Sequence, residues 1–123
     1  MKYIPIPETI PLYNLTGERM KESDDTDAEV TFSNFVLGRL GDPRFSVDRR
    51  SVQMADEIIK KMEGANGMLE LPHEHWKLLS EVTDKPSQQS AYHPAVSRNL
   101  LPFMNAICEA KDEPPTQAES ESE

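Results

Sequence analysis

Apolar residues recur at helical spacing in one part of this chain only, between residues 30 and 110. The clearest pattern lies within residues 47–63, where charged side chains fill the opposite side of the helix. Its apolar stripe consists of Val47, Met54, Ala55, Ile58, Ile59 and Met62. Ser46 is suited to cap the start of this helix, and Gly64 to end it. The pattern predicts an amphipathic helix over about residues 47–63.

Three more segments of this region have helical patterns. Residues 31–40 end before Gly41, a residue that commonly stops helices. Residues 72–82 begin with Pro72, which suits a first helical turn, and follow a short extended run at 68–71. Residues 94–110 contain Pro102, so this helix either kinks there or starts again after it. The predicted fold class is mainly α, a small bundle of about four helices.

The first fifteen residues form a different kind of segment, because Pro5, Pro7 and Pro11 disfavour a helix. We predict an extended arm over residues 1–15. Its apolar side chains are Tyr3, Ile4, Ile6, Ile10, Leu12 and Tyr13. Such an arm is either an edge strand on its own domain or a docking strand for another chain, and the sequence leaves both open.

The net charge of −9 is concentrated at the two ends. Residues 1–29 and 111–123 each carry a net −4, whereas the predicted helical domain, residues 30–110, carries −1. We predict a flexible acidic linker at 16–29 and a disordered acidic tail at 111–123. An acidic chain is poorly suited to bind nucleic acid or an anionic membrane directly.

The expected compartment is the cytoplasm. No stretch approaches the roughly 20 apolar residues of a membrane span, and the proline-broken N-terminus does not resemble a secretion signal. A single cysteine, Cys108, excludes an internal disulfide and fits a reducing environment.

No pattern of residues predicts catalysis, a metal or a cofactor. His73 and His75 would point about 200° apart on a helix, so they could not share a metal ion there. Cys108 lies late on a predicted helix beside Glu109, and both the helix dipole and the carboxylate disfavour a thiolate. The glycines form no phosphate-binding loop. We therefore expect a protein that is not an enzyme.

A basic cluster surrounds the first predicted turn between helices. It consists of Arg39, Arg44, Arg49 and Arg50, with Asp42 and Asp48 among them. The cluster is either a docking patch for an acidic partner or for the acidic tail, or a solvated surface with local ion pairs.

Two stretches of the sequence are similar to those of a known class of proteins. Residues 31–40, TFSNFVLGRL, and residues 99–107, NLLPFMNAI, resemble small acidic helical proteins of phage and prophage morphogenesis clusters. That class includes tail assembly chaperones and head or tail accessory factors. The resemblance implies a role in particle assembly and assigns no functional residue.

The leading hypothesis is a non-enzymatic adaptor or assembly factor that binds a protein partner with the help of its arm. The candidate partner-binding residues are the six apolar residues of the arm and the four arginines. The alternative is an acidic regulatory protein, or nucleic-acid mimic, that occupies a basic surface. That role needs carboxylates on a rigid face, whereas the predicted helical domain is nearly neutral.

Overall fold

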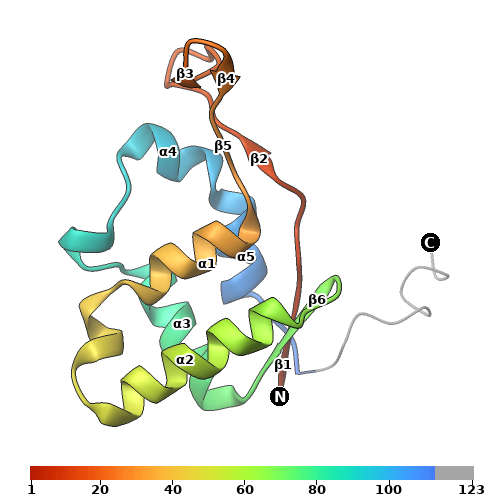
Figure 1. Ribbon diagram of the computed structural model, residues 1–123, viewed down its shortest axis with the longest axis vertical. Helices are drawn as coiled ribbons and strands as arrows, with labels where there is room; N and C mark the ends of the chain where they lie inside the picture. Colours follow the sequence, from red (N-terminus) through yellow and green to blue (C-terminus); the bar gives the residue numbers. More distant parts are fainter. Residues whose placement is uncertain (113–123) are drawn as a thin grey trace, which may run out of the picture.

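The structure is a computed structural model that describes residues 1–112, apart from the side chain of Ser90. Five α-helices make up most of the body (Figure 1). They are α1 (Phe32–Leu40), α2 (Arg49–Glu63), α3 (His73–Asp84), α4 (Pro94–Asn99) and α5 (Leu101–Cys108), with short 3-10 turns η1 (Pro43–Ser46) and η2 (Gln88–Ser90). Within residues 1–112, none of these helices is both long and apolar enough to cross a bilayer.

Six short strands in the described residues form three antiparallel pairs. They are β1 (Lys2–Pro5), β2 (Ile10–Pro11), β3 (Lys21–Ser23), β4 (Thr26–Asp27), β5 (Glu29–Val30) and β6 (Met68–Leu71). β1 pairs with β6, β2 with β5, and β3 with β4. The prediction of a mainly α bundle is therefore wrong, because the structure is mixed, with small antiparallel sheets beside the helices.

The physical reason for this error lies in residues 1–30. The prolines of this segment do exclude a helix, but the extended chain finds backbone partners in its own domain. The predicted linker at 16–29 contains β3, β4 and part of β5. Of the predicted tail at 111–123, only residues 111 and 112 lie within the described part of the chain.

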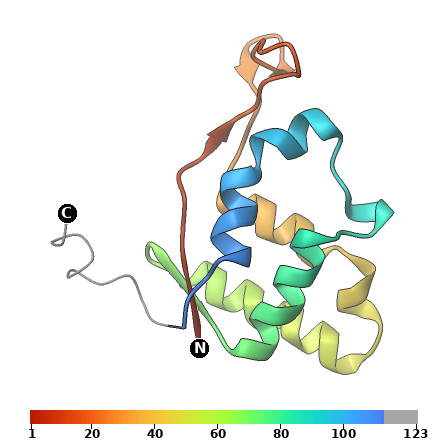
Figure 2. The same cartoon turned by 180° about the vertical axis from the view of Figure 1, so that it is seen from behind.

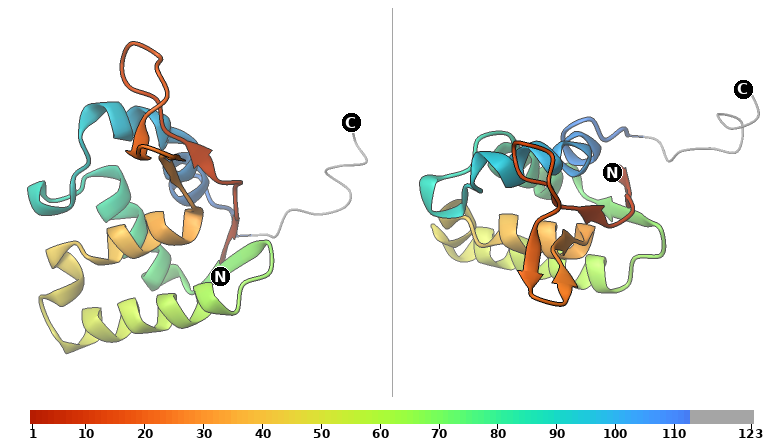
Figure 3. Two further views of the ribbon diagram at one scale, coloured as in Figure 1. Left: turned by 45° about the horizontal axis from the view of Figure 1, so that its top comes forward. Right: turned by 90° about the horizontal axis from the view of Figure 1, so that it is seen from above.

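The helices form two layers. Seen from above, α1 and α2 lie in one layer and α3, α4 and α5 in the other (Figure 3). The core between them is apolar and includes all four phenylalanines of the chain, and Phe32 and Phe35 are both in ring contact with Phe103. The fully buried core side chains include Phe35, Val36, Ile58, Leu69, Leu71, Leu79, Val82, Leu100, Phe103 and Ile107.

The predicted helix bounds are confirmed at some ends and shifted at others. α1 ends at Leu40, and Thr31 caps its start. α2 begins at Arg49 rather than at residue 47, because Asp48 caps it by accepting from the backbone N–H of Ser51. Val47 therefore precedes the helix and is 71% exposed instead of joining the apolar stripe.

The last predicted helix is divided into α4 and α5 at Leu100. Pro102 lies in the first turn of α5, where its missing N–H costs no helical hydrogen bond. The sequence allowed either a kink or a new helix at this proline, and the structure has a new helix.

The N-terminal strand is part of the core. β1 pairs with β6 in the register Lys2–Leu71 to Pro5–Met68, and Ile4, opposite Leu69, is fully buried. On its other side, the N–H of Tyr3 donates to the carbonyl of Lys111 at 2.9 Å. Pro5 is tolerated because its nitrogen lies on that outer side, where a strand needs no donor. β1 thus lies between β6 and the end of the described chain.

We predict that Ile4→Ala lowers the free energy of unfolding by about 2–5 kcal/mol, because it removes a fully buried side chain and leaves a cavity. Urea denaturation followed by circular dichroism measures the change. The control is Leu15→Ala, at a side chain that is 57% exposed, which we expect to change stability by less than about 0.5 kcal/mol. Equal effects of the two substitutions would contradict a core position for β1.

Candidate functional site

The histidines do not come together at one site. His75 lies on α3 with its Nε2 atom 3.1 Å from Glu57 Oε2 on α2. His93 caps α4, where its Nδ1 accepts from the N–H of Ala95 at 3.1 Å. His73 is exposed at the start of α3. Residues 1–112 contain no group of three or more His, Cys, Asp or Glu side chains arranged to hold a metal ion.

Cys108 is a poor nucleophile in this environment. The thiol is half-buried in a hollow of about 210 Å³ and lies 3.8 Å from the carbonyl oxygen of Ser80. Burial raises the pKa of Cys108, and the nearby carboxylates of Asp84 and Glu109 raise it further. The thiolate is therefore less populated than in an exposed cysteine at neutral pH.

The structure separates the four arginines of the basic cluster. Arg39 is only 2% exposed and lies inside the protein. Its guanidinium carbon is 4.7 Å from the ring centre of Tyr92 and 5.4 Å from that of Phe35. Gly38 allows this packing, because a Cβ atom there would lie 2.8 Å from the Tyr92 hydroxyl. Arg39 therefore contributes packing between α1 and the chain before α4 rather than surface charge.

Arg44 belongs to a polar corner around the buried carboxylate of Asp42. The Asp42 side chain accepts from the backbone N–H of Arg44 at 2.9 Å and from its Nε at 3.2 Å. It also accepts from the N–H of Ser87 at 2.8 Å and from the Ser87 hydroxyl at 3.1 Å. Arg44 in turn donates to the carbonyl of Lys85. This corner attaches η1 to the loop that follows α3.

The two remaining arginines are exposed. Arg49 and Arg50 begin α2, and Arg50 forms an ion pair with Glu74 at the start of α3. Because Arg39 is buried and Arg44 is held by Asp42, the four side chains do not share one accessible surface.

The six apolar residues of the arm are also divided. Ile4 and Leu12 are buried in the core, and Ile6 and Ile10 pack against it. Tyr3 is half-buried on β1, whereas Tyr13 is 41% exposed. Most of the arm therefore covers its own domain, and only its last part is accessible.

That accessible part continues into a compact element that we call the N-terminal ribbon, residues 10–30. Its tip, which contains β3 and β4, projects beyond the helices at one end of the molecule in both the front view and the view from behind (Figures 1 and 2). Its base is closed by three backbone hydrogen bonds of 2.9–3.0 Å that join Leu12, Met20 and Ala28 in a ring. The same three side chains face the core.

A side chain orders the first turn of the ribbon. Asn14 Oδ1 accepts from the backbone N–H groups of Thr16 at 3.0 Å and Glu18 at 2.9 Å. Gly17 completes the turn at a φ of +90°, which side chains with a Cβ rarely adopt. The asparagine and glycine were the available sequence signal for this turn, but the acidic composition around them led to the prediction of a linker.

Asn99 fastens the ribbon to the helical body. Its Oδ1 accepts from the N–H of Tyr13 at 3.2 Å, and its Nδ2 donates to the carbonyl of Tyr13 at 2.6 Å. Nδ2 also donates to the carbonyl of Ala95 within α4. The amide thus replaces a neighbouring strand for Tyr13 and couples the ribbon to α4.

The ribbon presents a mixed surface of apolar and acidic side chains. Leu15 is 57% exposed at its first turn, beside the partly exposed Tyr13. Its acidic residues are Glu18, Glu22, Asp24, Asp25, Asp27 and Glu29, against the basic residues Arg19 and Lys21. Lys21 forms an ion pair with Asp27, and this contact lowers the pKa of Asp27. The acidic excess therefore lies on an ordered element.

Comparison of the chain with protein-family models, with curated proteins and with solved structures finds no match.

The polar corner leads to a prediction about stability. Asp42→Ala should lower the free energy of unfolding by about 3–5 kcal/mol, because it leaves the donors of Arg44 and Ser87 without their buried acceptor. Thermal and urea unfolding measure the loss. Asp56→Ala, at an exposed carboxylate on α2, is the matched control and should leave the unfolding midpoint nearly unchanged. A small effect of Asp42→Ala would show that the corner is dispensable.

Proposed function

We propose that this chain is a non-enzymatic protein-binding module, an adaptor or assembly factor of the cytoplasm, that presents the N-terminal ribbon to a protein partner. The observation that carries the proposal is that residues 13–27 are mostly exposed and yet are held in a defined conformation by hydrogen bonds.

Holding these residues in one conformation costs conformational entropy. The domain does not offset this cost by burying their side chains, because most of them are exposed. Fixing each residue costs on the order of 1–2 kcal/mol of backbone entropy, and an isolated two-stranded hairpin is marginally stable. The chain nevertheless holds this segment with the Asn14 turn, the hydrogen-bonded ring at its base and the Asn99 amide. A preorganised surface loop lowers the entropic cost of binding a partner, which supports recognition as its role.

The exposed side chains of the ribbon define the chemistry of the partner. Leu15 and Tyr13 suit a shallow apolar pocket, and an aromatic residue is well suited to anchor an interface. The surrounding carboxylates suit a basic rim, which steers association through long-range attraction. We therefore propose a partner with an apolar pocket bordered by lysine or arginine. The resemblance to phage morphogenesis proteins supports a partner within an assembling particle.

The experiment that tests this function is affinity capture with mass spectrometry, using substitutions on the ribbon surface. Deleting residues 1–15 is unsuitable, because it would also remove Ile4 and Leu12 from the core. We predict that Leu15→Glu reduces recovery of specific partners at least about tenfold, because it places a charge in the apolar contact. Leu37→Glu is the matched control, since Leu37 is 45% exposed on α1 and lies outside the ribbon. This variant should bind partners as the unmodified chain does.

Both variants should unfold at the same temperature as the unmodified chain, which separates binding from stability. Partners that are retained equally by Leu15→Glu and Leu37→Glu would contradict the role of the ribbon.

A second function is supported by the ordered carboxylates. An acidic regulatory protein or nucleic-acid mimic needs negative charge on a defined surface, and the ribbon places a net charge of −4 on one protruding element. Such a chain would occupy the basic groove of a nucleic-acid-binding protein.

The salt dependence of binding distinguishes the two functions. For the mimic, we predict that raising the salt concentration from about 0.1 M to about 0.5 M weakens partner binding steeply, because the exposed charges become screened. Binding measured by biolayer interferometry should then also be lost in Asp24→Lys combined with Asp25→Lys, with Glu81→Lys on α3 as the control. Binding that resists salt but fails in Leu15→Glu contradicts the mimic and supports the adaptor.

A further inference from the structure

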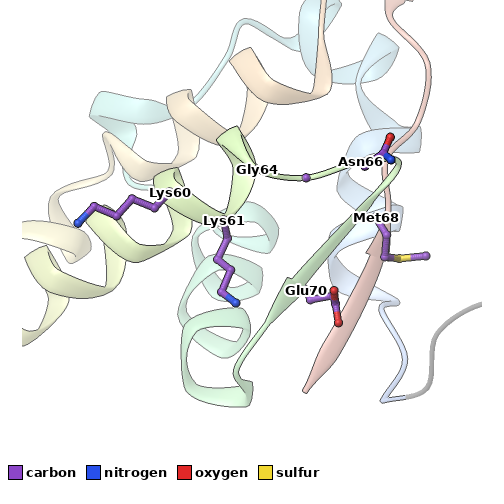
Figure 4. A pocket seen from close by; sticks show the side chains of 7 residues that line it. Lys60, Lys61, Gly64, Asn66, Met68 and Glu70 are labelled. Carbon is purple, nitrogen blue, oxygen red and sulfur yellow. The ribbon is translucent and has the colours of Figure 1, made fainter.

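The turn between α2 and β6 contains an asparagine that is followed by a glycine, Asn66 and Gly67. Figure 4 shows Asn66 at the far end of this turn, on the rim of a groove of about 380 Å³ between the end of α2 and β6. Both residues are exposed. Gly67 has a φ of +80°, and a Cβ atom added to it would meet no other atom within 4 Å. The peptide bond that joins the two residues is therefore uncrowded and open to solvent.

The two groups that can react in this turn are unrestrained. The backbone N–H of Gly67 donates to no acceptor within residues 1–112, and the side-chain amide of Asn66 has no hydrogen-bond partner there. Figure 4 also places the Asn66 side chain away from the charged groups of Lys61 and Glu70. Because the Cγ atom of Asn66 and the nitrogen of Gly67 are close along the chain, a bond between them closes a small five-membered ring. Rotation of the Asn66 side chain is then enough to bring the two atoms together.

The other asparagines of the chain lack this freedom. They are Asn14, Asn34, Asn99 and Asn105. Asn34 and Asn105 lie within α1 and α5, where the helical backbone is fixed. The side-chain amides of Asn14 and Asn99 are held by hydrogen bonds to backbone groups. None of the four is followed by glycine, so a Cβ atom crowds the nitrogen that would attack each of them.

We propose that Asn66 is a site of spontaneous modification, at which its amide side chain is converted to a carboxylate by way of a cyclic imide. Hydroxide from the solvent removes the proton of the Gly67 N–H, and the nitrogen forms a bond to Asn66 Cγ. The bond between Cγ and Nδ2 then breaks, and the nitrogen leaves as ammonia after taking a proton from water. The hydroxide is regenerated, so the reaction consumes only the water that opens the imide.

Water opens the imide in one of two ways. Addition of water to Cγ breaks the new bond to nitrogen and gives aspartate, which leaves the backbone unchanged. Addition to the backbone carbonyl carbon of Asn66 breaks the original peptide bond and gives isoaspartate, in which the chain continues through Cβ and Cγ. Each product gains a negative charge, and isoaspartate also lengthens the backbone by one carbon atom.

Both changes fall next to the pairing of β1 with β6. Asn66 follows the C-terminal end of α2, where the helix dipole disfavours a negative charge. The carbonyl of Gly67 accepts from the N–H of Ile6 at 3.1 Å, directly beyond the pair of Pro5 and Met68. A longer backbone before Gly67 displaces this carbonyl. Isoaspartate therefore loosens the end of the β1–β6 sheet from which the chain runs toward the N-terminal ribbon.

Peptide mapping by mass spectrometry tests the site. The full chain is incubated for several days at about 37 °C, at neutral and at mildly alkaline pH, since asparagine is among the thermolabile residues. We expect a gain of about 1 Da at Asn66, at a rate at least about tenfold above that of any other asparagine and higher at the higher pH. The four other asparagines are internal controls. No gain of mass at Asn66, or a gain shared equally among the five, overturns the proposal.

Two substitutions test the cyclic mechanism. Gly67→Ala adds a Cβ atom beside the attacking nitrogen and should slow the conversion at least about tenfold, although a φ of +80° strains alanine. Asn66→Gln keeps the glycine of the turn and requires a larger ring, so it should slow the conversion by a similar factor without that strain. An undiminished rate in Asn66→Gln overturns attack by the Gly67 nitrogen.

A comparison with Asn66→Asp separates the added charge from the longer backbone. The isoaspartate form, isolated by chromatography, should unfold about 2–5 °C below the fresh chain and exchange the amide hydrogen of Ile6 at least about tenfold faster. Asn66→Asp carries the charge on an unchanged backbone, so its Ile6 amide should exchange as in the fresh chain. Equal exchange of Ile6 in the fresh and isoaspartate forms overturns the effect on the β1–β6 sheet.

Discussion

Residues 2–5 and 68–71 lie far apart in the sequence, and their antiparallel pairing joins the N-terminal segment to the helical layers. The pairing buries Ile4 against Leu69 and brings the start of the chain beside α5. It also determines where the following residues run, because the chain leaves β1 at Pro5 and reaches the ribbon only after Ile6 and Ile10 pack on the core. Without this contact, the ribbon would lose its attachment at one end.

Two buried polar arrangements complete the domain. The Asp42 carboxylate gathers donors from η1 and from the loop after α3, so segments without regular structure acquire a defined position. Arg39 packs its guanidinium against the rings of both Phe35 and Tyr92, which stack on each other. In both cases a charged residue of the predicted basic cluster stabilises the fold, and the exposed ribbon becomes the stronger candidate for partner binding.

Local sequence determined the helices and excluded some alternatives. Helical spacing of apolar residues, Gly41 after α1 and Pro102 in the first turn of α5 act within a few residues of one another, and the elements they predict are present. Tertiary structure alone decided the rest. The pairing of β1 with β6, the burial of Arg39 and the fastening of Tyr13 by Asn99 join residues remote in sequence, and no local propensity encodes such contacts. The ribbon shows the difference most clearly, because its acidic composition predicts a linker, whereas its backbone hydrogen bonds and its attachment to α4 make it an ordered surface.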